Sequence, residues 1–274
     1  MADGARALLW RVGRKLYCLA RGDYPNRPET NGEYWLLDQV LGGTSREVVA
    51  IDVGANEGDW ALRAIDLASR HRVTIRLYAF EPAAQTRAVL TRRLSEHQTV
   101  SIYDHALSSG VGDASFYSSE NGSGTSSLSE ISGSSRELVK VTTLDSFLAE
   151  ERIEHIDILK IDTEGFDFEV LRGGELFLAK GVIEVVQFEY NWRWLINHHA
   201  LRDVFEYIKD KPYRLGKLVG NSIELFDEWH FELDRYFENN YVLIKQGSRL
   251  LEIAKPVRFD ETNCARSITT SSHA

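Results

Sequence analysis

The chain has few cysteines. Only Cys18 and Cys264 are present among its 274 residues, and they lie near opposite ends of the sequence. There is no CxxC pair, which excludes a disulfide framework and a cysteine-based zinc site. A low cysteine content suits a reducing compartment, so we expect a cytoplasmic protein.

Basic residues are also in the minority. The chain has 32 lysines and arginines against 41 aspartates and glutamates, which gives a formal net charge of −9. Electrostatic binding to nucleic acid needs a basic surface, so we expect no nucleic-acid partner. No apolar run approaches the ~20 residues that a transmembrane helix requires. With 43% hydrophobic residues, the chain can bury the core of one large domain or of two small ones.

The first 22 residues differ in charge from the rest of the chain. Five basic residues accompany a single acid, Asp3, and leucines recur at helical spacing. This pattern predicts an amphipathic helix that ends at Gly22. The interpretation that we favour is a helix packed on the main domain, and the alternative is a peripheral contact of residues 1–22 with anionic lipid or a lipid-linked substrate. A second helix is predicted over 33–41, closed by two glycines.

From residue 47, short apolar segments alternate with helical patterns. Strands are predicted at 48–53, 75–80, 100–103, 156–161 and 182–188. Helices are predicted at 60–70, 85–96, 166–171 and 201–209. This alternation indicates a doubly wound parallel sheet with helices on both faces, in which ligands bind at the carboxyl ends of the strands. Acids recur at or near those ends, namely at Asp52, Glu81, Asp104, Asp162 and Glu189.

Three further segments interrupt or follow this pattern. Residues 108–135 are rich in serine and glycine, which predicts either a solvated loop with a β-hairpin (114–117 and 138–141) or a substrate lid. Residues 213–218 and 240–245 are expected to form a hairpin that closes the sheet edge. The acidic stretch 224–238 between them is expected to be a solvated surface, and the residues after Gly247 a loose tail.

The first strand leads into the turn Asp52-Val53-Gly54-Ala55-Asn56-Glu57-Gly58. Gly54 permits a tight turn, and the helix that follows presents an electropositive N-terminus. A dinucleotide-binding turn would have a second glycine where this chain has Asn56, so a pyrophosphate fits poorly and a carboxylate fits better. Glu81, at the end of the second strand, can accept hydrogen bonds from both hydroxyls of a ribose. Adenosine joined to an amino acid, without phosphate, describes S-adenosylmethionine.

Seven blocks, in order between about Val48 and Glu189, resemble the FkbM-type methyltransferase family. They are Asp52 to Gly58, Ala79 to Pro82, Ala106 to Ser108, Gly124 to Leu128, Val141 to Asp145, Leu159 to Gly165 and Glu169 to Gly174. The resemblance implies the α/β class I methyltransferase fold, a Rossmann-like, doubly wound, seven-stranded and mostly parallel sheet with a reversed last hairpin. The domain organisation expected is an N-terminal helical arm (1–45), a methyltransferase domain (46–246) and a C-terminal tail (247–274).

The resemblance also implies roles for individual residues in binding S-adenosylmethionine. The residues implied in cofactor binding are Asp52, Gly54, Ala55, Asn56, Gly58, Glu81, Pro82, Asp104, His105, Ala106 and Asp162. Among them, the glycine-containing turn would line the methionine end, Glu81 would hold the ribose, and 104–106 would lie near the adenine. His105 has the alternative of being a solvated loop residue.

Methyl transfer to a hydroxyl is helped by a base or a metal ion, because the alcohol loses its proton late. Asp162, Glu164 and Glu189 are the carboxylate candidates, and Asp162 with Glu189 would also suit Mg²⁺. The alternative for Asp162 and Glu164 is to bind the cofactor amine or to cap the next helix. His198 or His199 is a further candidate base.

The tryptophans at 192 and 194 alternate, so we expect one to face the acceptor pocket and the other the core.

The function expected is O-methylation of a small-molecule or glycan acceptor, at a hydroxyl of a sugar, glycolipid or natural-product scaffold. The alternatives are N-methylation of a small molecule and a catalytically silent binding protein of the same fold. Whether the chain forms a homo-oligomer is left open.

Overall fold

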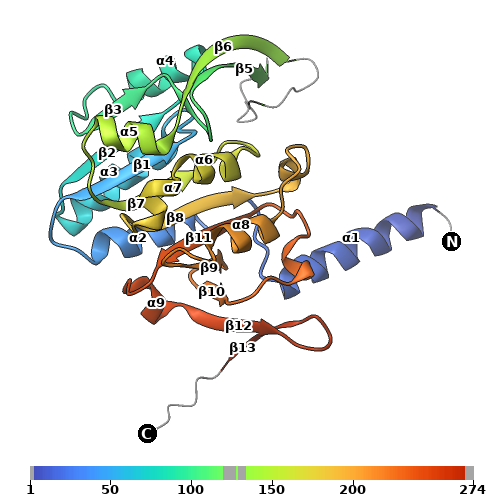
Figure 1. Ribbon diagram of the computed structural model, residues 1–274. Coiled ribbons are helices and arrows are strands. Elements are labelled where there is room, and N and C mark those ends of the chain that lie inside the picture. The colour runs from blue at the N-terminus through green and yellow to red at the C-terminus, as the bar shows by residue number, and fades with distance from the viewer. Residues whose placement is uncertain (1–2, 120–127, 129–133, 269–274) are drawn as a thin grey trace, which may run out of the picture.

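The computed structural model describes residues 3–119, 128 and 134–268, and its centre is one large β-sheet (Figure 1). Ten strands follow the order β13-β12-β10-β9-β11-β8-β7-β1-β2-β3. Seven of them form the expected methyltransferase core: β1 (Val48–Val53), β2 (Ile75–Phe80), β3 (Val100–Tyr103), β7 (Ile156–Ile161), β8 (Ile183–Tyr190), β9 (Tyr213–Leu218) and β11 (Asn239–Lys245). β3, β2, β1, β7 and β8 pair in parallel, whereas β11 is antiparallel to both β8 and β9. The α/β class and the reversed last hairpin are therefore confirmed.

The sheet has more strands than the seven expected. β10 (Ile223–Phe226), β12 (Lys255–Phe259) and β13 (Ala265–Ser267) extend it beyond β9. The prediction of a loose tail is wrong for this part of the chain, where α9 (Leu250–Ile253) leads into β12 and Val257 is buried. Phe259 also stacks on Phe226, with 5.8 Å between ring centroids, so burial of apolar groups holds the segment on the sheet. Residues 269–274 lie outside the described residues.

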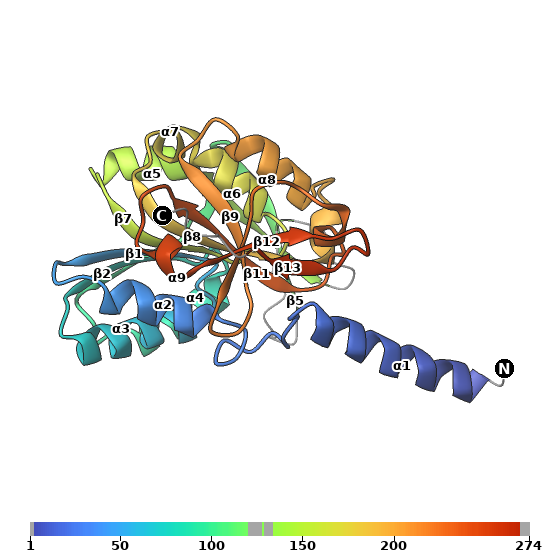
Figure 2. The same cartoon turned by 90° about the horizontal axis from the view of Figure 1, so that it is seen from below.

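Helices cover both faces of the sheet (Figure 2). On one face lie α2 (Glu33–Gly42), α3 (Asp59–His71) and α4 (Ala84–Arg93), and on the other α5 (Leu144–Glu150), α6 (Asp167–Gly173), α7 (Glu175–Ala179) and α8 (Leu201–Ile208). Short 3₁₀ helices η1 (Trp192–Leu195) and η2 (Phe231–Leu233) follow β8 and β10. The sequence did not predict α5, and α4 ends three residues before the predicted end of its helix.

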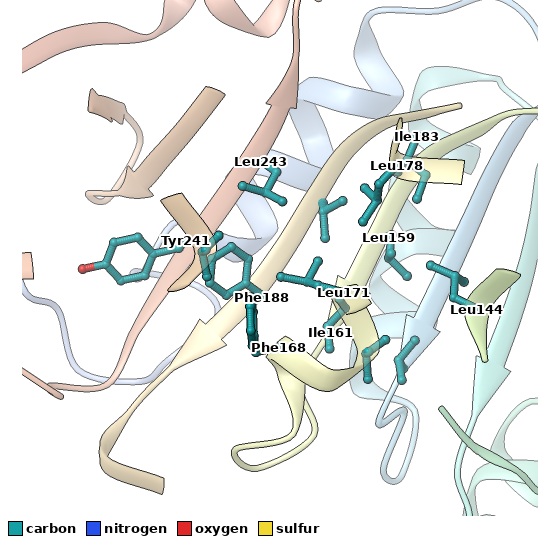
Figure 3. Packing of buried hydrophobic residues seen from close by; sticks show 14 of the residues in the cluster. Leu144, Leu159, Ile161, Phe168, Leu171, Leu178, Ile183, Phe188, Tyr241 and Leu243 are labelled. Atoms are coloured by element: carbon teal, nitrogen blue, oxygen red, sulfur yellow. The ribbon is translucent and has the colours of Figure 1, made fainter. Parts of the chain in front are cut away.

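Alternation along the strands explains the two cores. Ile51 and Val53 point toward α5, α6 and α8, whereas Val48 and Ala50 point toward α2 and α3. Figure 3 shows the first core, in which Phe188 and other side chains of the sheet meet those of the covering helices. Both faces of the central strands β1, β7 and β8 are buried, which accounts for their largely apolar sequences.

A small second sheet lies beside the end of β2. It has the order β4-β6-β5 and consists of β4 (Ala106–Leu107), β5 (Gly112–Ser119) and β6 (Ser134–Thr142). The predicted hairpin is thus confirmed and longer than expected. Of the residues between β5 and β6, where a substrate lid was considered, only Leu128 is described, and the rest of that prediction lies outside the described residues.

The N-terminal helix α1 (Asp3–Ala20) extends away from the sheet (Figures 1 and 2). The helix itself is confirmed, but none of its residues is buried, so packing on the main domain is limited to its C-terminal end. There the Tyr17 hydroxyl donates to Glu232 Oε2 at 2.6 Å, and Gly22 follows in the left-handed conformation. Within the described residues, no helix combines the length and the apolar character needed to cross a bilayer.

The acidic stretch 224–238 is only in part the solvated surface that we expected. Glu224 lies within β10, and Glu232 is only 9% exposed. Arg235 donates to Glu232 Oε1 at 2.5 Å, and this bond lowers the pKa of Glu232 to about 2. The expectation is therefore wrong for Glu224 and Glu232, whereas Asp227, Glu228 and Glu238 are exposed as expected.

Candidate active site

The turn between β1 and α3 is held against the ends of the neighbouring strands. Gly54 has φ +79° and donates its N–H to Phe80 O at 3.0 Å. A Cβ on Gly54 would lie 2.0 Å from the carbonyl oxygen of Asp162. Asp162 in turn donates its backbone N–H to Val53 O at 2.9 Å. Only glycine fits this close approach, which brings the ends of β1, β2 and β7 together.

Glu81 follows β2 and faces this turn. One carboxylate oxygen accepts the Asn56 N–H and the other accepts the Ala83 N–H, each at 2.9 Å. The residue is only 5% exposed, and its burial raises the pKa of the carboxyl to about 7. A carboxylate oxygen has two lone-pair sites, so each oxygen keeps one for an incoming hydroxyl. The arrangement can therefore hold a vicinal diol.

An open pocket lies over these strand ends. Eight residues predicted for the site line it: Gly54, Asn56, Glu81, Pro82, His105, Ala106, Asp162 and Glu164. Six others do not line it: Asp52, Ala55, Gly58, Asp104, Glu189 and His198. The structure thus brings together both ends of the predicted cofactor site and two of the candidate bases.

Apolar residues form a wall of the pocket that the sequence analysis did not identify. The additional lining residues are Val53, Phe80, Thr86, Leu107, Phe116, Leu128, Thr163 and Phe166. Phe116 and Leu128 come from β5 and the segment after it, and they pack together with Val139 and Val141. The sequence contains one indication of this wall, because Phe116 is a large aromatic residue within a stretch that otherwise has few apolar residues. A flat heterocycle would suit this wall.

Lys160 links two of the strand-end acids. Its Nζ lies 3.2 Å from Asp162 Oδ2 and 3.4 Å from Asp52 Oδ1. Asp52 is fully buried, its Oδ2 has no hydrogen-bond partner among the described residues, and burial raises the pKa of its carboxyl. Asp52 therefore lies beneath the pocket, whereas Asp162 reaches the pocket surface with the ammonium of Lys160 behind it.

Glu164 is the second acid in the pocket wall. Its φ of +55° places it in the left-handed region, and Arg193 donates to its Oε2. Burial raises the pKa of the Glu164 carboxyl to about 8, although the neighbouring guanidinium opposes the shift. Such a carboxyl exchanges a proton close to neutral pH, which is the property required of a general base.

Glu189 lies deeper than the sequence suggested. It is 6% exposed, and its two oxygens accept from Asn26 Nδ2 at 3.0 Å and from Asn191 Nδ2 at 2.6 Å. Burial raises the pKa of the Glu189 carboxyl well above its usual value. The contact with Asn26 shows that the segment between α1 and α2 reaches the acids behind the pocket.

The arrangement of the acids does not support the Mg²⁺ prediction. In the parts of the chain that the structure describes, no three His, Cys, Asp or Glu side chains converge as metal ligands would. Asp162 faces Lys160, and Glu189 is held by two amides, so neither presents a free oxygen pair to a shared ion. We therefore derive no step through a metal.

Of the residues 104–106, which were predicted to lie near the adenine, His105 and Ala106 line the pocket and Asp104 does not. His105 lines the pocket, and its Nδ1 lies 3.0 Å from Asp104 Oδ1. The Asp104 side chain is more than half exposed and lies outside the lining. Asp104 can thus orient the imidazole but does not itself face the pocket.

The aromatic and histidine residues after β8 also have separate environments. Trp194 is fully buried and donates to Glu189 O at 3.0 Å, whereas Trp192 is 54% exposed. His198 is exposed, with φ +59°, and His199 contacts Glu169 Oε1 at 2.8 Å. The expectation that one tryptophan faces the core is confirmed, but Trp192 and both histidines lie outside the pocket lining.

Comparisons with known proteins add to this geometry. The chain is 27% identical over 149 residues to the 2-O-methyltransferase NoeI of Sinorhizobium fredii. This match covers 48% of the chain and 59% of the relative, so the chain spans less than two thirds of that protein.

Two solved structures are similar at low sequence identity. Methyltransferase FkbM from Methylobacillus flagellatus KT has a TM-score of 0.44 and 14% identity, over 72% of this chain and 43% of that one. A putative methyltransferase from Streptococcus mutans in complex with SAH has a TM-score of 0.44 and 11% identity, over 81% of this chain and 99% of that one.

The family model of the methyltransferase FkbM domain matches residues 52–215, which is more than half of the chain. The matched region begins in β1, ends in β9 and contains every acid of the pocket wall. The chain belongs to the FkbM methyltransferase family.

Proposed function

We propose that the chain transfers a methyl group from S-adenosylmethionine to a hydroxyl of a sugar, a glycolipid or a natural-product scaffold. The observation that carries this proposal is the position of three acids in one pocket. Glu81 offers two acceptor sites on one side, and Asp162 and Glu164 line the same space after β7, which is separated from β2 by β1. The side with Glu81 fits a ribose, and the carboxylates on the other side can accept a proton from the acceptor hydroxyl.

The pocket residues fit the three parts of the proposed donor. The turn at Gly54 and Asn56 leads into the N-terminus of α3, which favours the carboxylate of the methionine end. Glu81 would accept hydrogen bonds from both ribose hydroxyls. His105 and Phe116 border the apolar part of the pocket, where the adenine would lie.

The bound donor would supply a methyl group on a positively charged sulfur, which is already activated for displacement. The protein then has to align the acceptor hydroxyl with the carbon–sulfur bond and take up its proton. The acceptor oxygen would form the new bond to carbon as the bond to sulfur breaks, and Asp162 or Glu164 would take up the hydroxyl proton. The products are the methyl ether and S-adenosylhomocysteine.

The choice of a hydroxyl rests on two considerations. The pocket contains carboxylates that can accept a proton late in the reaction, as an alcohol requires. The relative from Sinorhizobium fredii is named as a 2-O-methyltransferase. At 27% identity and with partial coverage, this relative supports the acceptor class and does not name the acceptor.

The test is a turnover assay with matched acceptors. Purified protein is supplied with S-adenosylmethionine and a panel of sugars, with each alcohol paired with the amine that replaces the same hydroxyl. We expect S-adenosylhomocysteine to be released with alcohols and to accompany an O-methyl product seen by mass spectrometry. Turnover only with the amines would indicate N-methylation, and cofactor binding without turnover across the panel would indicate a silent binding protein. Either result would contradict the proposal.

A further inference from the structure

The helix α1 exposes a continuous apolar side. Besides Trp10, five large aliphatic residues of this helix are between 48% and 74% exposed: Leu8, Leu9, Val12, Leu16 and Leu19. Successive residues of an α-helix are turned by about 100°, which places these five between about 120° and 220° around the helix from Arg14. We call these five residues the apolar arc. Contiguous exposed apolar side chains of this kind mark an interaction surface.

The contacts between α1 and the rest of the protein are on the opposite side. The Arg14 guanidinium lies 5.1 Å from the centre of the Phe237 ring, and Tyr17 meets the same ring edge-on at 6.0 Å. Arg21, one turn beyond, donates to Glu232 O at 2.5 Å and contacts its carboxylate at 3.2 Å. The protein thus holds the C-terminal end of α1 in place by one side and turns the apolar arc outward.

Charge separates the helix from the rest of the chain. Within α1 there are four basic residues, Arg6, Arg11, Arg14 and Lys15, against the single acid Asp3. The whole chain, in contrast, carries −9. Lys15 and Arg6 come at about 100° and 280° around the helix, on the two edges of the apolar arc. A basic border around an inserted apolar side is the pattern of helices that lie in the interface of an anionic bilayer.

We propose that α1 binds to the surface of an anionic lipid bilayer, lying in its interface with the apolar arc among the acyl chains and the basic residues among the headgroups. Charge complementarity favours this partner over a second copy of the chain, because two copies would bring two acidic bodies together. The 18-residue helix is about 27 Å long, and Arg6 lies about 12 Å along its axis from the contact at Arg14, which is beyond the ~8 Å screening length at physiological salt. Repulsion between the acidic body and the lipid is therefore screened at the far end of the helix.

The test is sedimentation of the full chain with vesicles. We expect the protein to sediment with vesicles of phosphatidylcholine and phosphatidylglycerol and to bind at least tenfold more weakly to phosphatidylcholine alone. Leu16→Glu should weaken binding at least tenfold, because it places a charge in the apolar arc. The matched control is Leu176→Glu on α7, since Leu16 and Leu176 are 61% and 60% exposed. The control should bind as the wild type does.

Three outcomes would overturn the proposal. The first is that the wild type does not bind anionic vesicles. The second is that Leu16→Glu and Leu176→Glu bind these vesicles equally. The third is that the chain dimerises through α1 and does not bind lipid. Sedimentation velocity of the wild type and of Leu16→Glu distinguishes the last outcome, because a dimer that depends on Leu16 would appear without vesicles. Circular dichroism of the variants shows whether each remains folded. The test is independent of methyl transfer, since it needs neither donor nor acceptor.

Discussion

The substitution Glu81→Gln tests the donor site by changing one carboxylate. In the protein, one Glu81 oxygen accepts the Asn56 N–H and the other the Ala83 N–H, so both are needed as acceptors. Glutamine has one acceptor oxygen and one NH₂ group, so it can satisfy only one of these donors and only one ribose hydroxyl. A charge-assisted hydrogen bond is worth about 1.5–3 kcal/mol, so we expect the Kd for S-adenosylhomocysteine to rise about 10- to 100-fold.

Isothermal titration calorimetry at pH 8 measures this change without turnover. Because burial raises the pKa of Glu81 to about 7, the wild type should also bind about tenfold more weakly at pH 6, where the carboxyl is mostly protonated. Glu81→Gln should lose this pH dependence. The control is Glu151→Gln, since Glu151 is exposed, accepts from the Tyr103 hydroxyl at 3.0 Å and lies outside the pocket lining. A folded Glu81→Gln protein with wild-type affinity would refute the assignment of Glu81 to the ribose.

Three further predictions concern the base, the turn and the fold. In the wild type at saturating S-adenosylmethionine, kcat should rise with pH up to about 8, because Glu164 must be ionised to accept a proton; Glu164→Gln should lose this rise and about 100-fold in rate, and an unchanged profile would favour Asp162 as the base. Gly54→Ala should lower the free energy of unfolding in urea by at least about 2 kcal/mol, because its Cβ meets a backbone oxygen, whereas Gly110→Ala, with open space at its Cβ, should change it little. Burial raises the pKa of Glu33 from 4.5 to about 7, so the folded state holds a proton that the unfolded state releases and stability falls as pH rises through this range. Thermal unfolding of Glu33→Gln between pH 5 and 8 should show a fall in stability that is smaller by about 2 kcal/mol, and parallel curves would contradict this account.

The parallel core of the sheet was predictable from the sequence. The predicted bounds of β1, β2, β3 and β7 agree with the structure. For β1, β2 and β7 the reason is burial of nearly every residue, which produces short apolar runs with clear ends, whereas β3 is a partly exposed edge strand. The strands β12 and β13 were not predicted. β12 contains only Val257 and Phe259 as large apolar residues, and its strand conformation depends on pairing with β10, which no local pattern reveals.

The site was predicted in part, and the position of each acid explains where the prediction ended. Glu81 and Asp162 come immediately after β2 and β7, and both line the pocket. Asp52 and Glu189 lie within β1 and β8, where strand alternation directs their side chains into the buried layer beside α2. A shift of one or two residues in the end of a strand thus decides whether an acid lines the pocket or is buried. The sequence alone does not define the strand ends that closely.

The structure of the protein with S-adenosylhomocysteine, determined by crystallography, tests the central claim most directly. The account predicts that the ribose 2′- and 3′-hydroxyls lie within hydrogen-bonding distance of the Glu81 carboxylate, with the sulfur on the side of the pocket that Asp162 and Glu164 line. The ligand in another part of the molecule, or in this pocket with its ribose away from Glu81, would contradict the account.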